Sequence, residues 1–179
     1  MIVSIRPPGE RSDFENVVGE LQEESGSRGS CVSSPIENCA NVISWVYHLG
    51  VGTFSVRTDR KPGILWFEIE GFMTVEDTTA YVAAHKAAVD SFGDRDYKVF
   101  GDIRKMSTLS AECAALFEQA KKYSNAHPNF RGSAIWVSSS VLVAEQHRRT
   151  STSSGVTGTE LIGSDEKALW AHLDKVYRK

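Results

Sequence analysis

The chain has 179 residues, which suits one domain with its own hydrophobic core and little beyond it. A hydrophobic content of 41% and a charged content of 24% exclude a chain that is disordered throughout or fibrous. The formal charge of −3 leaves no excess of Lys and Arg to neutralise a phosphate backbone, so nucleic-acid binding is not expected.

Membrane insertion and secretion are not expected either. No run of the sequence approaches the roughly 20 apolar residues that a membrane-spanning helix needs. Near the N-terminus, Pro7, Pro8 and Glu10 lie where a secretory signal would have an apolar core. The expected location is the cytoplasm.

The cysteines give no sign of a metal or a cofactor. Cys31, Cys39 and Cys113 are odd in number and form no CxxC pair, so we do not expect a structural zinc site. We expect no cofactor either. Cys113 falls on the apolar face of a predicted helix, where a free thiol packs as a small hydrophobic group.

The first 50 residues differ in composition from the rest. Residues 20–34 are rich in Glu, Ser and Gly and show neither a helical nor a strand period. Residues 1–50 are therefore expected to be a poorly ordered N-terminal extension, with residues 51–179 as the folded domain. Residues 41–49 are apolar enough to pack against that domain, either as a short strand or as a helix.

The domain begins with a predicted hairpin and a helix. Thr53–Thr58 and Ile64–Ile69 are strand-like, and the residues between them favour a turn. The spacing of apolar residues over 74–92 predicts a helix that Thr74 caps, with Asp77 completing a capping box.

Strands and helices then alternate to the end of the chain. Ser110 is the expected cap of the second helix, and Ser164 that of the last. The remaining predicted elements are a strand at Tyr97–Ile103, a helix at Leu109–Tyr123, a strand at Gly132–Val137, a short helix at Val141–Arg149, a polar loop at Thr150–Ser154, a strand at Thr157–Ile162 and a helix through Tyr177.

This order predicts an α/β fold. The sheet should be mixed but mostly parallel, with about five strands and with helices packed on it, because right-handed helical connections join the later strands. Functional loops are expected at the carboxyl ends of the parallel strands.

The domain resembles STAS-like proteins of the SpoIIAA-like group, which are related to bacterial anti-sigma-factor antagonists and, more distantly, to CRAL-TRIO lipid-binding domains. The resemblance rests on the order and spacing of ILWFEIEGFMTVEDTTAY, KVFGDIRKMS and SDEKALWAHL over residues 64–173. It implies a non-catalytic module that either regulates a protein partner through protein–protein contacts, as in anti-sigma-factor signalling, or binds a small ligand. The chain could also form a homodimer.

The resemblance also points to one loop. In STAS antagonists the strand equivalent to the one ending at Asp102 is followed by an Asp-Ser pair, and that serine takes a regulatory phosphate. Here the loop reads RKMSTLSAE, with Leu109 before Ser110. The candidate switch residues are Ser107, Thr108 and Ser110, because amides at a helix N-terminus stabilise added negative charge. The alternative is that Ser110 only caps the helix.

Nearby charged residues are candidate contacts for a ligand or partner. Asp102, Arg104 and Lys105 surround the start of this loop, although Asp102 could instead accept hydrogen bonds from loop amides. His147 and Arg148 near the end of the third helix could bind an anion, or could simply compensate the helix dipole.

Enzyme signatures are missing from the sequence. GxSxG, GxxxxGK[ST] and HExxH do not occur, so catalysis is not expected. His85 lies on an apolar helix face and is expected to be a core residue with a hydrogen-bond partner. Trp66, Trp136 and Trp170 are expected to pack in the core, or else to line a cavity. The alternative functions are a carrier of a small apolar or anionic ligand and an uncharacterised enzyme.

Overall fold

The computed structural model describes residues 42–48, 52–59 and 61–176. Of the predicted N-terminal extension, residues 1–50, it therefore describes Val42–His48 alone. Val42–His48 is a strand that pairs with Thr53–Asp59, so the sheet reaches into the range expected to be an extension.

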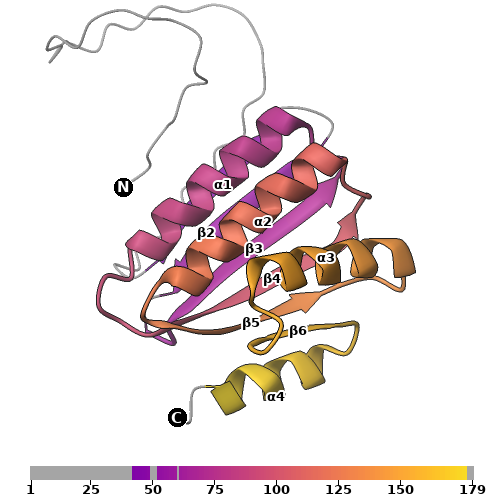
Figure 1. The fold of residues 1–179 in the computed structure, drawn as a ribbon. Coiled ribbons are helices and arrows are strands. Elements are labelled where there is room, and N and C mark those ends of the chain that lie inside the picture. The colour runs from indigo at the N-terminus through magenta and orange to yellow at the C-terminus, as the bar shows by residue number, and fades with distance from the viewer. Residues whose placement is uncertain (1–41, 49–51, 60, 177–179) are drawn as a thin grey trace, which may run out of the picture. The chain divides into compact units, whose positions relative to one another are not determined.

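The described residues form one six-stranded sheet whose strands lie in chain order (Figure 1). The second strand runs antiparallel to both of its neighbours, the first and the third, and the last three strands run parallel to the third. The predicted α/β fold with a mixed, mostly parallel sheet is confirmed. The sheet has one strand more than the five predicted, and that strand is the first in the chain. The strands are β1 (Val42–His48), β2 (Thr53–Asp59), β3 (Ile64–Gly71), β4 (Tyr97–Met106), β5 (Phe130–Trp136) and β6 (Glu160–Gly163).

Four helices of the described residues pack on this sheet. Alternation along the strands divides the side chains between the two faces. Leu65 and Phe67 belong to a core cluster with residues of three helices, whereas Ile64 and Phe100 belong to a separate cluster with the last helix. The helices are α1 (Val75–Asp90), α2 (Ala111–Ala126) and α3 (Val141–Ser154) on the first face, and α4 (Glu166–Val176) on the second.

Local capping chemistry sets where α1 and α2 begin. The Thr74 hydroxyl accepts a hydrogen bond from the amide of Asp77, and the Asp77 carboxylate accepts one from the amide of Thr74, which confirms the capping box. Ser110 accepts a hydrogen bond from the amide of Cys113 and caps α2 as predicted.

The end of α3 and the cap of α4 differ from the prediction, and β4, β5 and β6 have other bounds than those predicted. Helix α3 runs to Ser154, so the expected polar loop is helical; its hydroxyls donate back to helix carbonyls, as Ser154 does to Thr150, and Gly155 ends the helix at φ 78°. Asp165, rather than Ser164, caps α4, because its carboxylate accepts hydrogen bonds from the amides of the second and third helical residues.

The larger core lies between the sheet and α1–α3. Tyr81 of α1 stacks on Phe117 of α2 with ring centroids 4.8 Å apart, and the buried Cys113 packs there as predicted. Gly101 of β4 is needed for this packing, because a Cβ at that position would lie 2.1 Å from the ring of Phe67. Close packing of this kind fixes α1 and α2 on the sheet.

The smaller core lies beneath α4. Phe100 stacks on Trp170 with centroids 4.7 Å apart and lies 5.1 Å from Trp66. Trp66, Trp136 and Trp170 pack against this core as expected, but each is only partly buried. No helix among those described is both long enough and apolar enough to cross a membrane.

Candidate functional site

The loop from Ser107 to Ser110 connects β4 to α2 at the carboxyl end of the parallel strands. It is held on both sides. The amide of Ser107 donates to the carbonyl of Gly71 at the end of β3, at 2.9 Å. The side-chain amide of Gln146 on α3 bonds both the N–H and the carbonyl of Leu109, at 3.0 and 2.9 Å. The loop is therefore hydrogen-bonded to the end of β3 on one side and to α3 on the other.

The three candidate switch hydroxyls of this loop are not equivalent. Ser110 is engaged as the cap of α2. Ser107 and Thr108 are exposed, and their hydroxyls make no hydrogen bond to the described residues. The structure therefore supports the capping role of Ser110, and it leaves Ser107 and Thr108 accessible to a modifying enzyme.

Exposed apolar side chains flank the same loop. Phe72, Val141 and Leu142 are 46%, 76% and 69% exposed, and they are the large apolar side chains that the described part of the chain leaves exposed. Phe72 directly follows Gly71, to which the loop is bonded, and Leu142 lies one helical turn before Gln146. We call Phe72, Ser107, Thr108, Val141 and Leu142 the strand-end surface. Sequence reasoning missed its apolar members, because nothing local distinguishes them from core residues.

Asp102, Arg104 and Lys105 are already paired with one another or with neighbours. Arg104 donates to both carboxylate oxygens of Asp102 and its guanidinium lies 3.5 Å from the ring centroid of Trp136, on the α4 face. Burial alone would raise the pKa of Asp102, but hydrogen bonds from Arg104 outweigh it and lower that pKa. Lys105 bonds Glu70 at 3.1 Å. A phosphate on the loop would have to compete with Glu70 for Lys105.

His147 and Arg148 are separated by burial. The ring of His147 is 1% exposed and lies edge-on to Phe117, so it cannot meet a partner from outside, contrary to the sequence-based interpretation. Burial, together with the nearby charge of Lys121, lowers its pKa to about 3. Arg148 is exposed and lies 3.7 Å from Glu145.

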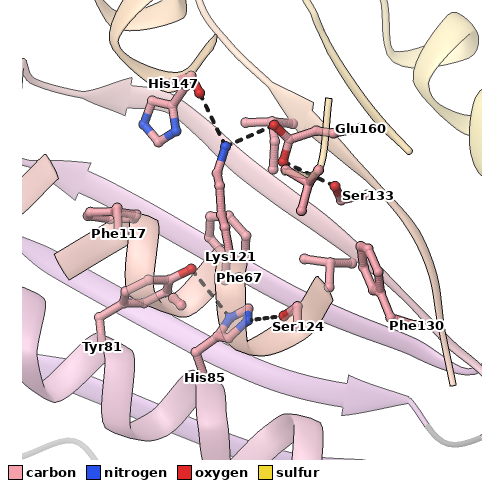
Figure 2. Close-up of a pocket in the computed structure, with 14 residues that line it drawn as sticks. Phe67, Tyr81, His85, Phe117, Lys121, Ser124, Phe130, Ser133, His147 and Glu160 are labelled. Atoms are coloured by element: carbon pink, nitrogen blue, oxygen red, sulfur yellow. Dashed lines mark hydrogen bonds and ion pairs between the residues drawn. The ribbon is translucent and has the colours of Figure 1, made fainter. Parts of the chain in front are cut away.

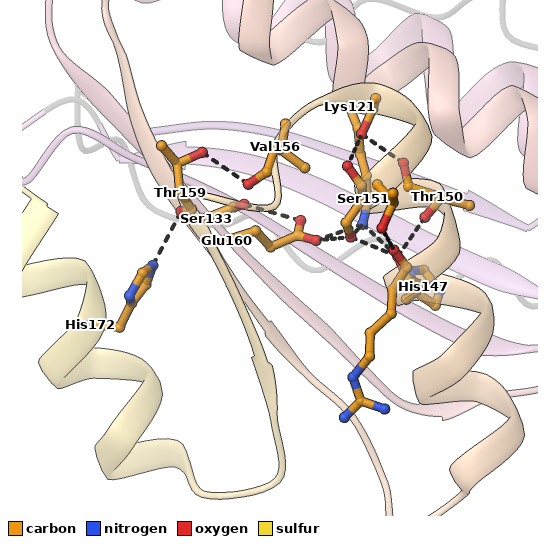
Figure 3. Close-up of polar contacts among 12 residues, drawn as sticks. Lys121, Ser133, His147, Thr150, Ser151, Val156, Thr159, Glu160 and His172 are labelled. Carbon is orange, nitrogen blue, oxygen red and sulfur yellow. Dashed lines mark hydrogen bonds and ion pairs between the residues drawn. The ribbon is translucent and has the colours of Figure 1, made fainter.

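A buried polar cluster lies beneath α3 (Figures 2 and 3). The ammonium of Lys121 bonds Glu160 and Ser151, both at 2.8 Å, and the carbonyl of His147 at 3.3 Å. Glu160 also accepts hydrogen bonds from the hydroxyls of Ser133 and Ser151. We call these five residues the interior cluster; they join α2, β5, α3 and β6.

The Lys121–Glu160 ion pair is removed from solvent. The side chains are 12% and 2% exposed. Burial lowers the pKa of Lys121, although Glu160 acts in the opposite direction. The sequence carries no signal for this pair, since the two residues are 39 positions apart and neither lies in a motif.

Beside the interior cluster, a second buried group surrounds His85. Its Nε2 lies 2.7 Å from the hydroxyl of Ser124 and its Nδ1 lies 3.4 Å from that of Tyr81, which confirms the expected core histidine (Figure 2). Burial lowers the pKa of His85 to about 4. His147 differs, because neither of its ring nitrogens has a hydrogen-bond partner among the described residues.

The space between these groups is small. A cavity of about 20 Å³ is lined by Tyr81, His85, Lys121, His147 and Glu160, among others. A volume near 10–15 Å³ admits about one water molecule, so this cavity has no room for a substrate of ordinary size. Within the described residues no group of three or more His, Cys, Asp or Glu side chains could hold a metal ion.

Comparisons with known proteins do not identify a family for this chain. A scan of the sequence against protein-family models finds no match, and a search of curated proteins finds none.

Proposed function

We propose that the protein is a non-catalytic, STAS-like regulatory module that binds a protein partner through the strand-end surface. The observation that carries the proposal is that the exposed side chains of Phe72, Val141 and Leu142 surround one loop, in which the hydroxyls of Ser107 and Thr108 make no hydrogen bond to the described residues. Exposed apolar side chains gathered in one place are typical of protein interaction sites. The resemblance to anti-sigma-factor antagonists supports the same use of this edge.

Phosphorylation of Ser107 or Thr108 would be the switch in this proposal. A phosphate adds a charge of about −1.5 to −2. Among exposed apolar side chains that charge would oppose the burial that a partner requires, and it would lie near the N-terminus of α2, where helix amides favour it. Ser110 is the less favoured acceptor, because its oxygen already accepts the hydrogen bond that caps the helix.

The loop and the apolar surface are mechanically linked. Gln146 holds Leu109 by two hydrogen bonds, and Leu142 precedes Gln146 by one helical turn on α3. The interior cluster fixes the same helix to α2 and β6 through Lys121 and Glu160. A shift of the loop therefore acts on a helix that carries part of the binding surface.

The test begins with a partner captured from the native host and then purified. Its affinity is compared for the wild-type chain, for the double variant Phe72→Ser/Leu142→Ser and for Asp94→Ser. Asp94 is exposed at the opposite end of the parallel strands, and its side chain makes no hydrogen bond or ion pair to the described residues, so it is a control for surface change alone. We expect the double variant to lose at least about tenfold in affinity and the control to lose nothing.

Phosphopeptide mapping of the native protein tests the switch separately. We expect phosphate on Ser107 or Thr108, and we expect Ser107→Glu to weaken binding of the purified partner. Unmodified peptides under all growth conditions, together with equal partner binding by Ser107→Glu, Ser110→Glu and wild type, would remove the switch from the proposal. Equal binding by the double surface variant would remove the interface itself.

The alternative functions have less support in the geometry. An apolar ligand carried inside the larger core would need far more than the cavity of about 20 Å³ found there. An enzyme would need a substrate to reach Lys121, Ser151 and Glu160. Turnover of a panel of esters or phosphates that disappeared in Ser151→Ala would favour the enzyme.

A further inference from the structure

A second hollow lies on the α4 face of the sheet, away from the helices that cover the larger core. Its volume is about 140 Å³. This volume is similar to that of a cavity of about 150 Å³ that holds a benzene molecule in another protein, so a small organic group fits. We call this hollow the tryptophan cleft; it is lined by Ser55, Arg57, Trp66, Phe67, Glu68, Phe100, Asp102, Trp136 and Glu166.

The register of the sheet places the lining residues in two rows that cross the strands. Ser55 pairs with Glu68, Glu68 with Asp102, and Asp102 with Trp136, which makes a mainly polar row across β2 to β5. In the neighbouring row, Arg57 pairs with Trp66 and Trp66 with Phe100. Glu68 and Asp102 therefore lie in one row with Trp136, and Trp66 lies beside Arg57 and Phe100 in the neighbouring row.

The charge of the cleft is negative. Its lining holds three carboxylates, those of Glu68, Asp102 and Glu166, and one guanidinium, that of Arg57. With Arg104, whose guanidinium lies over Trp136, the formal sum is −1. Asp102 is compensated by Arg104. The side chain of Glu68 makes no hydrogen bond or ion pair to the described residues, and it is exposed. An entering anion would meet this excess of negative charge, whereas a cation would be attracted.

The indole rings already attract cations from the chain itself. The guanidinium of Arg57 lies 4.5 Å from the ring centroid of Trp66, and that of Arg104 lies 3.5 Å from the ring centroid of Trp136. Trp is the aromatic side chain that holds cations best. Arg57 has no other side-chain partner among the described residues, so it can leave Trp66 at little cost.

We propose that the tryptophan cleft binds an organic cation, an ammonium or guanidinium group with a small apolar body. The indole rings of Trp66 and Trp136 hold the cation, and Glu68, which makes no hydrogen bond or ion pair to the described residues, supplies a negative charge beside it. This site is on the opposite face from α1–α3 and is separate from the proposed partner surface. The cation could belong to a free small molecule or to a Lys or Arg side chain of another protein.

The test uses choline and its uncharged analogue 3,3-dimethylbutan-1-ol, which has carbon in place of nitrogen. The full chain is titrated with each compound while the indole N–H signals of Trp66 and Trp136 are followed by NMR. We expect saturable shifts of both signals with choline and weaker binding of the alcohol by about fivefold or more. Equal binding of the two compounds, or no saturable shift with choline, would overturn the proposal.

Two charge variants with opposite expected effects separate binding from a change in folding. Glu68→Gln should weaken choline binding by about threefold to tenfold, because it removes that carboxylate. Arg57→Gln should strengthen binding by about twofold or more, since it removes both a competing cation and a repelling charge. Glu70→Gln is the matched control, since Glu70 lies on the same strand but does not line the cleft.

The sign of the Arg57→Gln effect is decisive. A weaker affinity in that variant, with tighter binding of acetate than of choline by the wild-type chain, would show an anion site and overturn the proposal. A parallel titration with Nα-acetylarginine amide assigns the source. Tighter binding of the arginine derivative supports a protein side chain as the cation, and tighter binding of choline supports a free small molecule.

Discussion

The interior cluster and the strand-end surface contain similar polar groups in opposite surroundings. In the interior cluster the hydroxyls of Ser133 and Ser151 are bonded to Glu160, so burial fixes their roles. At the strand-end surface the hydroxyls of Ser107 and Thr108 have no described partner. Polar residues that are buried and bonded serve the fold, whereas those left exposed and unbonded are available for regulation. Substitutions should therefore affect stability in the first region and binding in the second.

The largest loss of stability is expected for Lys121→Met. It leaves Glu160 buried without its cation, and removing one member of a buried ion pair costs about 3–5 kcal/mol. Urea unfolding should show this difference. Lys122→Met is the control on the same helix, because Lys122 pairs with Glu118 at the surface and its loss should cost less than about 1 kcal/mol. Equal losses in the two variants would contradict the distinction between the two regions.

Acid is expected to destabilise the fold through His85 and His147. Burial lowers their pKa values to about 4 and about 3. Because the folded state holds both rings neutral, their contribution is complete above the unfolded pKa near 6.5 and is lost as the pH falls toward the folded values. Each ring should remove about 1.4 kcal/mol per pH unit below that point.

The measurement is the free energy of unfolding in urea between pH 7 and pH 5. His147→Leu should lower the slope over this range by about half, because one of the two titrating rings is gone. A slope unchanged by that substitution would mean that His147 is not held neutral in the folded state.

A smaller difference is expected within the loop itself. Ser110→Ala removes the cap of α2 and should cost about 1 kcal/mol. Ser107→Ala removes a hydroxyl without a described partner and should change stability by less than about 0.5 kcal/mol. Thermal melts of the two variants compare them directly. If Ser107→Ala were the more destabilising, its hydroxyl would be part of the fold and a poor candidate for a switch.

The smallest effect on stability is expected for Phe72→Ser/Leu142→Ser. Both side chains are largely exposed, so their replacement should leave the free energy of unfolding within about 0.5 kcal/mol of wild type. The melting temperature should not fall, even where partner binding is lost. A large fall would show that these side chains are packed in solution.

Features set by adjacent residues could be predicted from the sequence. The caps at Thr74 and Ser110 depend on partners three residues away, and both predictions are confirmed. The end of α3 could not be predicted in this way, because a run of Ser and Thr favours a loop unless each hydroxyl finds a helix carbonyl. At the start of α4, Ser164 and Asp165 are both good caps, and only the backbone direction selects Asp165.

Features set by distant residues could not be predicted. Lys121 and Glu160 meet only because β6 lies beside β5 and beneath α3, which no local pattern records. His147 looked like part of a basic helix end, but the helix continues and its ring points into the core. The tryptophans pack against the smaller core, and Trp66 and Trp136 also line a cleft, so both readings of the sequence apply in part. The carboxylates of Glu68 and Asp102 beside them follow from strand register alone.

The order of the strands has a consequence for the growing chain. Each strand lies beside the one that precedes it in sequence, so the sheet can be extended from one edge as the polypeptide is made. Lys121 is synthesised well before Glu160, which lies on the last strand. Until that strand is added, the Lys121 ammonium lacks the Glu160 carboxylate with which it forms its buried ion pair. The final strand therefore completes the electrostatics of the core as well as the sheet, and a chain that ends before it cannot close the larger core without a cost.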